Sequence, residues 1–93
     1  MTIVFPVRVE SGEIVEVLMS MKKRGFGEGY WNGLGGKFNP ELDSSVEDTP
    51  VRESEEEARI KITRLEKVGT LDFAFPSNPD WDQKARISLA YEW

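Results

Sequence analysis

The sequence contains no cysteine and no histidine, two residue types on which many enzyme sites depend. Without cysteine the chain forms neither disulfides nor thiolate metal sites, and this composition fits a reducing compartment. We therefore expect a cytoplasmic protein, with the nucleus and the mitochondrion left open as alternatives. Without histidine, imidazole zinc sites and histidine-based acid–base catalysis are excluded. Any catalysis must then use carboxylates, lysine, arginine, tyrosine or a metal-bound water.

Long apolar runs, a secretion signal and an excess of positive charge are also missing. No apolar stretch approaches the ~20 residues that a membrane-crossing helix needs. Residues 1–7 lack a basic region and a small-residue cleavage site, so we expect no secretion signal. The net charge of −5 argues against a nucleic-acid polymer, which requires a basic surface. A small phosphate ester, bound through a cation, remains a compatible partner.

The 93 residues suffice for one small domain with one modest core. Alternating or β-branched apolar runs predict strands, which we place at 3–9, 14–21, within 31–38, 68–75 and 87–93. The first two strands are expected to form a hairpin, and Pro6 puts the first at a sheet edge or marks a bulge. In the fourth strand Leu71, Phe73 and Phe75 share one face. The last strand carries four large apolar residues to the chain end, which predicts an exposed edge and a domain cut short.

Three glutamates, Glu53, Glu56 and Glu57, occur at the helical spacings i, i+3 and i+4. Residues at these spacings share one face of a helix, where three carboxylates repel one another unless a cation lies between them. A hard divalent cation such as Mg²⁺ takes oxygen ligands of this kind, and substrate phosphates fill its remaining positions. The alternative is a solvated charged face, which is the commoner fate of a glutamate-rich helix.

The start of this helix is ambiguous. Ser45 to Asp48 resembles a capping box with aspartate in place of glutamate. Alternatively Thr49 is the N-cap and Pro50 the first helical residue, where proline is favoured. We favour Thr49, or a distorted first turn, and expect the helix to end near Arg59 or Ile60. Its apolar face is thin and consists of Val51, Ala58 and Ile60, with Ser54 at a position that favours a large apolar residue.

Six of the eight glycines lie within residues 22–37. Such a density indicates backbone at positive φ, or backbone that another group approaches closely. A hairpin and its loop explain the cluster as well as a binding loop does, because isolated glycine motifs are weak signals. The basic residues 22–24 are equally compatible with a solvated surface, and Asn32 before Gly33 with simple turn chemistry.

Gly35 to Glu41, followed by Arg52 to Ile60, resembles the signature of the Nudix hydrolases. That signature is G-x5-E-x7-R-E-U-x-E-E-x-G-U, where U is a bulky apolar residue. Here the spacer after Glu41 has ten residues instead of seven. Glu41 and Asp43 therefore compete for the first acidic position of the signature.

Two residues depart from the signature, and a longer stretch extends the resemblance. Ser54 replaces the bulky apolar residue, and Arg59 replaces a glycine that is expected at positive φ. Residues 21–37 are very similar to the matching segment of the oxidised-purine nucleoside triphosphate hydrolases within the Nudix family. Residues 67–69 and the phenylalanines of 73–75 share this similarity.

The resemblance implies an α+β fold of Nudix type, occupying residues 1–93 as a single, partial domain. Its mixed, mainly antiparallel sheet would carry the signature helix, with the final strands and the second helix missing. It also implies Mg²⁺-dependent hydrolysis, with Mn²⁺ as the alternative ion, of oxidised purine nucleoside triphosphates to monophosphate and pyrophosphate. Such a reaction removes damaged precursors from the nucleotide pool.

The resemblance also implies roles for particular residues of this chain. The metal ligands would be Glu53, Glu56 and Glu57 together with the Gly36 carbonyl, and Arg52 would hold the carboxylates through a bidentate pair. Glu56 or Glu57 would polarise the attacking water. Candidate phosphate- and base-binding residues are Lys22, Lys37, Asn32, Phe73 and Phe75, although the phenylalanines are also compatible with a packed core.

Two alternatives to a working hydrolase remain. A catalytically impaired Nudix fragment would bind nucleotide or a partner without turnover. Alternatively, the chain folds only when its last strand joins a partner chain. A complete enzyme of this type is expected to be a monomer.

Overall fold

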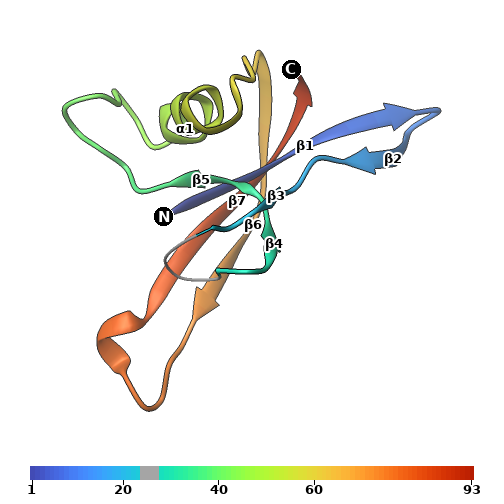
Figure 1. Cartoon of the computed structure of the whole chain (residues 1–93). Coiled ribbons are helices and arrows are strands. Elements are labelled where there is room, and N and C mark those ends of the chain that lie inside the picture. The colour runs from blue at the N-terminus through green and yellow to red at the C-terminus, as the bar shows by residue number, and fades with distance from the viewer. Residues whose placement is uncertain (24–27) are drawn as a thin grey trace.

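The computed structural model describes residues 1–23 and 28–93 (Figure 1). One helix, α1, lies on a twisted sheet from which two hairpins project. The elements are β1 (Thr2–Glu10), β2 (Glu13–Val17), β3 (Ser20–Met21), β4 (Trp31–Asn32), β5 (Leu34–Gly36), α1 (Asp48–Ala58), β6 (Arg64–Phe73), the 3₁₀ helix η1 (Pro79–Trp81) and β7 (Gln83–Glu92). No helix among these residues is long and apolar enough to cross a membrane.

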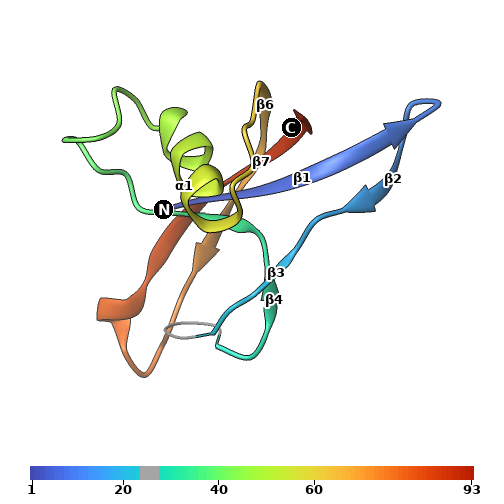
Figure 2. The same ribbon diagram turned by 45° about the horizontal axis from the view of Figure 1, so that its top comes forward.

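The sheet is mixed and mainly antiparallel, as predicted. Its strand order is β2-β1-β7-β6, and β5 pairs with β1 beside this path. β1 and β7 run parallel, whereas β2, β5 and β6 pair antiparallel to their neighbours. β3 and β4 form a separate two-stranded pair. Figure 2 shows α1 lying over the face formed by β5 and β1.

Pro6 lies in the central strand of the sheet, so both predictions for it were wrong. β1 pairs with β5 through Thr2–Val4 and with β2 through Val7–Glu10. Pro6 occupies the point where one pairing ends and the other begins, and its carbonyl accepts a hydrogen bond from Leu18 N over 2.8 Å. Proline has no N–H to contribute to a ladder, and a change of partner is a position that tolerates this loss. The irregularity in the ladder falls between Arg8 and Val9.

The prediction that the last strand is an exposed edge was also wrong. β7 pairs with β1 on one side and with β6 on the other, so it lies inside the sheet. The two ends of the strand order are β2, where Ile14, Val15 and Val17 are each about half exposed, and β6. β6 begins at Arg64 and ends at Phe73, so it starts earlier than predicted and leaves Phe75 outside the strand.

The core lies between α1 and the sheet. Its buried members are Val4, Leu34, Ile62 and Ala90, and the partly buried residues packed against them are Leu18, Val51, Ile60 and Leu65. In β7 the small residues Ser88 and Ala90 are buried, whereas Ile87 and Leu89 are only half-buried. The large apolar residues of β7 therefore point to the sheet face opposite α1.

α1 begins at Asp48, one residue before the favoured N-cap. Thr49 is therefore inside the helix, and the N-cap prediction was wrong. The Asp48 carboxylate accepts hydrogen bonds from the N–H groups of Ser44 and Ser45, each over 3.1 Å, which is the reciprocal half of a capping box. Pro50 lies in the first turn, where backbone N–H groups have no helical partner, so its missing donor costs little.

α1 ends at Ala58, and Arg59 follows in the left-handed conformation with φ 56° and ψ 33°. Backbone N–H groups of Arg59 and Ile60 donate to the carbonyls of Glu55 and Ser54, which closes the helix end. The expected positive φ at this non-glycine position is confirmed. The helix face against the sheet buries Ser54 completely, and Ser54 Oγ has no partner among the described residues. Ala58, predicted for the apolar face, is exposed.

Arg59→Gly should stabilise the chain by about 1 kcal/mol, because glycine adopts the left-handed conformation without the steric cost of a Cβ. Thermal unfolding of the full chain measures the change. Arg59→Ala is the matched control: it removes the charged side chain but keeps the Cβ, so its midpoint should stay near wild type. Equal stabilisation by both variants would show that charge, and not backbone strain, sets the effect.

Candidate functional site

The acidic face of α1 lies against the glycine strand β5. The Glu53 carboxylate approaches Gly36 so closely that a Cβ built at Gly36 would lie 2.8 Å from the carboxylate carbon. Glu57 Oε1 accepts a hydrogen bond from the Gly35 N–H over 3.1 Å. Gly35 itself has φ +145° and passes directly against the Thr2 carbonyl. Glycine at both positions therefore lets two helix carboxylates reach the strand backbone.

Arg52 connects two of the three candidate ligands. Its Nη1 donates to Glu53 Oε1 over 3.0 Å and to Glu56 Oε2 over 3.2 Å. Glu56 lies one helical turn after Arg52, and its side chain is about half exposed. One guanidinium nitrogen thus separates two carboxylates that would otherwise repel each other.

The bidentate partner of Arg52 is Asp43, whereas the resemblance implied that the candidate ligands themselves would fill this role. Arg52 Nε donates to Asp43 Oδ1 over 2.8 Å, and Nη2 donates to Oδ2 over 3.0 Å. The Asp43 side chain is fully buried. Glu41, the competing residue, is exposed, and its backbone N–H donates to Asn39 Oδ1. Asp43 therefore occupies the position opposite the signature arginine.

Asp43 accepts more hydrogen bonds than the ion pair alone supplies. Its Oδ2 also accepts from the Asn39 N–H over 3.0 Å and from Thr49 Oγ1 over 2.9 Å. The Arg52 guanidinium, followed by these donors, holds the pKa of Asp43 well below its usual range although burial opposes this. The same pair raises the pKa of Arg52. Asp43 is thus ionised throughout the neutral range.

Glu57 has a different electrostatic environment. Burial is the main cause that raises the pKa of its carboxyl, and the nearby Glu53 charge adds to the effect. The Gly35 N–H and the positive charge of Lys22 oppose this rise in pKa. Glu57 also borders an open hollow of about 470 Å³, which is further lined by Ser20, Met21, Lys22, Lys23, Leu34 and Ala58. Lys22 is therefore placed beside the acidic face of α1.

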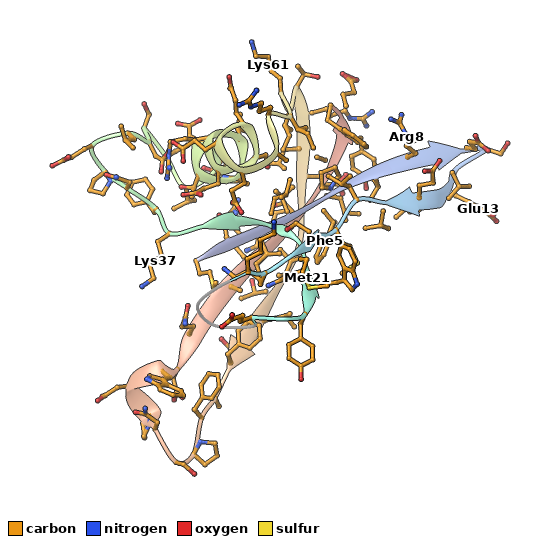
Figure 3. The ribbon with its side chains drawn as sticks, viewed as in Figure 1. Phe5, Arg8, Glu13, Met21, Lys37 and Lys61 are labelled. Atoms are coloured by element: carbon orange, nitrogen blue, oxygen red, sulfur yellow. The ribbon has the colours of Figure 1, made fainter. Side chains whose placement is uncertain are left out.

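Two other predicted residues contribute mainly their backbone. The Lys37 carbonyl accepts a long hydrogen bond of 3.4 Å from Arg52 Nη2, while its side chain points from β5 away from α1 (Figure 3). The Gly36 carbonyl accepts from Thr2 Oγ1 over 3.1 Å. The structure thus separates the Lys37 ammonium from the carboxylates that the sequence suggested it would accompany.

The candidate base-binding residues lie outside α1, which carries the carboxylates. Asn32, in β4, accepts a hydrogen bond from the Gly33 N–H over 2.8 Å. Phe73 is half-buried at the end of β6, and Phe75 meets Trp81 edge-to-face with ring centroids 5.8 Å apart. Sequence reasoning missed Trp81, because it follows a loop in which no repeating pattern of aromatic residues indicates a contact with Phe75. Predictions that fall on residues 24–27 concern a part of the chain outside the described residues.

The donor chemistry of the site suits a divalent cation. Glu53, Glu56 and Glu57 offer hard oxygen donors on one helix face beside a glycine backbone. In residues 1–23 and 28–93, however, no three acidic side chains converge into a group that could hold a metal ion. Arg52 and the Gly35 N–H hold these carboxylates instead. A cation would therefore have to replace contacts to these two donors.

Comparison with known proteins places this geometry in a family context. No family model matches the sequence. A crystal structure of the NUDIX domain of Shewanella oneidensis NrtR, in complex with ADP ribose, superposes with a TM-score of 0.77 at 17% identity, over 97% of this chain and 57% of that one. A MutT NUDIX hydrolase from Burkholderia pseudomallei superposes with a TM-score of 0.70 at 28% identity, over 98% of this chain and 67% of that one. The chain has the Nudix fold. The expected fold class is thus confirmed.

The curated sequence relatives are named as hydrolases. The mouse protein named oxidized purine nucleoside triphosphate hydrolase is 45% identical over 64 residues, which cover 69% of this chain. The matched segment covers 40% of the mouse protein, so the similarity spans less than half the length of that relative. The resemblance inferred from the signature is therefore confirmed over the matched segment.

Asp43→Asn should lower the midpoint of thermal unfolding by several degrees at neutral pH, because it leaves Arg52 without its buried anionic partner. A carboxyl with a depressed folded-state pKa stabilises the fold above its unfolded pKa of about 3.9 and loses this effect as the pH falls further. The gap between wild type and variant should therefore be constant above about pH 5 and shrink below about pH 4.

The matched control is Glu41→Gln at the exposed competing position, which should unfold like wild type at every pH. A gap that persists unchanged into acid would contradict the assignment of Asp43. Equal destabilisation by the two variants would also contradict it.

Proposed function

We propose that this chain hydrolyses oxidised purine nucleoside triphosphates to a monophosphate and pyrophosphate, and so removes damaged nucleotides from the cytoplasmic pool. The observation that carries the proposal is the carboxylate cluster of α1. Glu53 and Glu56 share one nitrogen of Arg52, and Glu57 meets the glycine strand beside Lys22. The hydrolase name of the mouse relative supports the same reaction and substrate.

A divalent cation completes the proposed site, with Mg²⁺ as the expected ion and Mn²⁺ as a substitute. Glu53, Glu56 and Glu57 would hold it, and the Gly36 carbonyl, whose residue packs against the Glu53 carboxylate, would complete its ligands. When bound, such an ion neutralises phosphate charge and activates water. The exposed Glu56 is the ligand freest to leave Arg52, because its contact is the longer of the two on Nη1.

The chain's own residues have distinct parts in this proposal. Lys22 would attract the triphosphate to the hollow beside Glu57, because an ammonium binds phosphate as a point charge. Arg52, fixed by Asp43, would orient the two carboxylates that it contacts. Glu56 or Glu57 would polarise the attacking water. Asn32, Phe73 and Phe75 remain the candidates for contacting the base.

A second function, nucleotide binding without turnover, is favoured by one specific observation. The described acidic side chains do not form a ready-made metal group, since donors from the protein already occupy them. A chain that keeps this arrangement with nucleotide bound would recognise the ligand and leave its phosphoanhydride intact.

Glu56→Gln should reduce pyrophosphate release from oxidised purine triphosphates by at least about 100-fold, because an amide neither binds Mg²⁺ well nor accepts a proton from water. The unfolding midpoint should change little, since the amide oxygen still accepts from Arg52. Glu55→Gln, at the exposed neighbouring position, is the control and should retain activity. Full activity of the Glu56 variant would contradict the proposed role of the cluster.

Nucleotide should also stabilise the chain. A non-hydrolysable purine triphosphate with Mg²⁺, at about 100 times its dissociation constant, should add about 2.7 kcal/mol to the free energy of unfolding. Thermal unfolding with and without these ligands measures the shift. A shift without pyrophosphate release would support the binding function, and absence of any shift would contradict both functions for this chain.

A further inference from the structure

Thr49 is a polar residue buried at the base of the acidic site. Its side chain has no solvent exposure, and its Oγ1 donates to Asp43 Oδ2 over 2.9 Å. Thr49 and Arg52 are three residues apart in α1, so their side chains share one helix face. Both therefore reach the same carboxylate from the same helix.

The Asp43 carboxylate joins the loop to the first turn of α1. Its Oδ2 receives three donors: the Asn39 N–H from the loop, and Thr49 Oγ1 and Arg52 Nη2 from the helix. Oδ1 receives Arg52 Nε alone. The threonine hydroxyl is the one side-chain donor in this set that carries no charge. It can thus be removed without taking either charge out of the ion pair.

We propose that Thr49 is a positioning residue for the candidate metal ligands. Its hydroxyl fixes the Asp43 carboxylate, the carboxylate fixes the Arg52 guanidinium, and Nη1 of Arg52 sets the spacing of Glu53 and Glu56. This role rests on the proposed function, because it matters only if those glutamates hold a cation. The Nudix signature described above assigns no role to position 49.

The hydroxyl of Thr49 acts by fixing the orientation of the Asp43 carboxylate. Without the hydroxyl, the buried Oδ2 of Asp43 loses one of its three donors, and the carboxylate is free to rotate about its bond to Cβ. Rotation would break the parallel pair with Nε and Nη2 of Arg52 and displace Nη1 from the glutamates. Partners that orient metal ligands typically change metal affinity 10- to 100-fold when removed. Since both charges of the pair remain in place, we expect a loss at the lower end of this range, about tenfold.

The test measures the affinity of the full chain for Mn²⁺ in the absence of nucleotide. The electron paramagnetic resonance signal of the free ion reports how much Mn²⁺ remains unbound. The variants are Thr49→Val, which keeps the shape and loses the hydroxyl, and Thr49→Ser, which keeps the hydroxyl. Thr49→Ala provides a second comparison with the serine variant, which differs from it by the hydroxyl alone. Thermal unfolding of each variant without metal reports any purely structural effect.

If Thr49 positions the metal ligands, the valine and alanine variants should bind Mn²⁺ about tenfold more weakly than wild type. The serine variant should bind like wild type. Equal Mn²⁺ affinity in all four proteins would overturn the role of Thr49, even if the valine variant unfolds at a lower temperature. Weakening in the serine variant equal to that in the alanine variant would also overturn it. A wild-type chain that takes up no Mn²⁺ would instead refute the proposed metal site, and the positioning role with it.

Discussion

The buried ion pair between Asp43 and Arg52 is the interaction on which the candidate site depends. It joins the loop before α1 to the first turns of that helix, and it leaves Nη1 of Arg52 free to hold Glu53 and Glu56. A buried charge without its partner is strongly destabilising, so each residue requires the other. The pair therefore organises two helix carboxylates, Glu53 and Glu56, that would otherwise repel each other.

The sheet places the acidic face of this helix against the glycine backbone of β5. β1 pairs with β5, β7 and β2, so the glycine strand is anchored to the central strand of the fold. Gly35 and Gly36 have no Cβ, which lets Glu53 and Glu57 approach their peptide groups. The same topology also decides which strands lie at the edges of the sheet. The last strand is enclosed between β1 and β6, and one end of the strand order is instead β2, in the hairpin where Figure 3 labels Arg8 and Glu13.

Sequence reasoning identified most elements and their chemistry. Period-two apolar patterns located the long strands, and the glutamate spacing located the acidic face of α1, because both signals are local. Two predictions, for Thr49 and for Pro6, were wrong because of tertiary contacts. Thr49 was expected to cap the helix, yet its hydroxyl donates to Asp43, six residues earlier in the chain. Pro6 was expected at an edge, yet the partner of β1 changes at this residue, which no local pattern reveals.

The sequence by itself determined the Nudix signature and the absence of histidine and cysteine chemistry, since both follow from residue type and spacing. The left-handed conformation at Arg59 was expected because the signature that the sequence resembles has a glycine at this position. Only the tertiary structure decided between Glu41 and Asp43, because a longer spacer leaves two acids within reach of one arginine. Burial settles the choice: Asp43 lies where Asn39, Thr49 and Arg52 converge, and Glu41 remains in solvent. Convergence of donors from a loop and a helix is a property of the folded chain, which no linear spacing encodes.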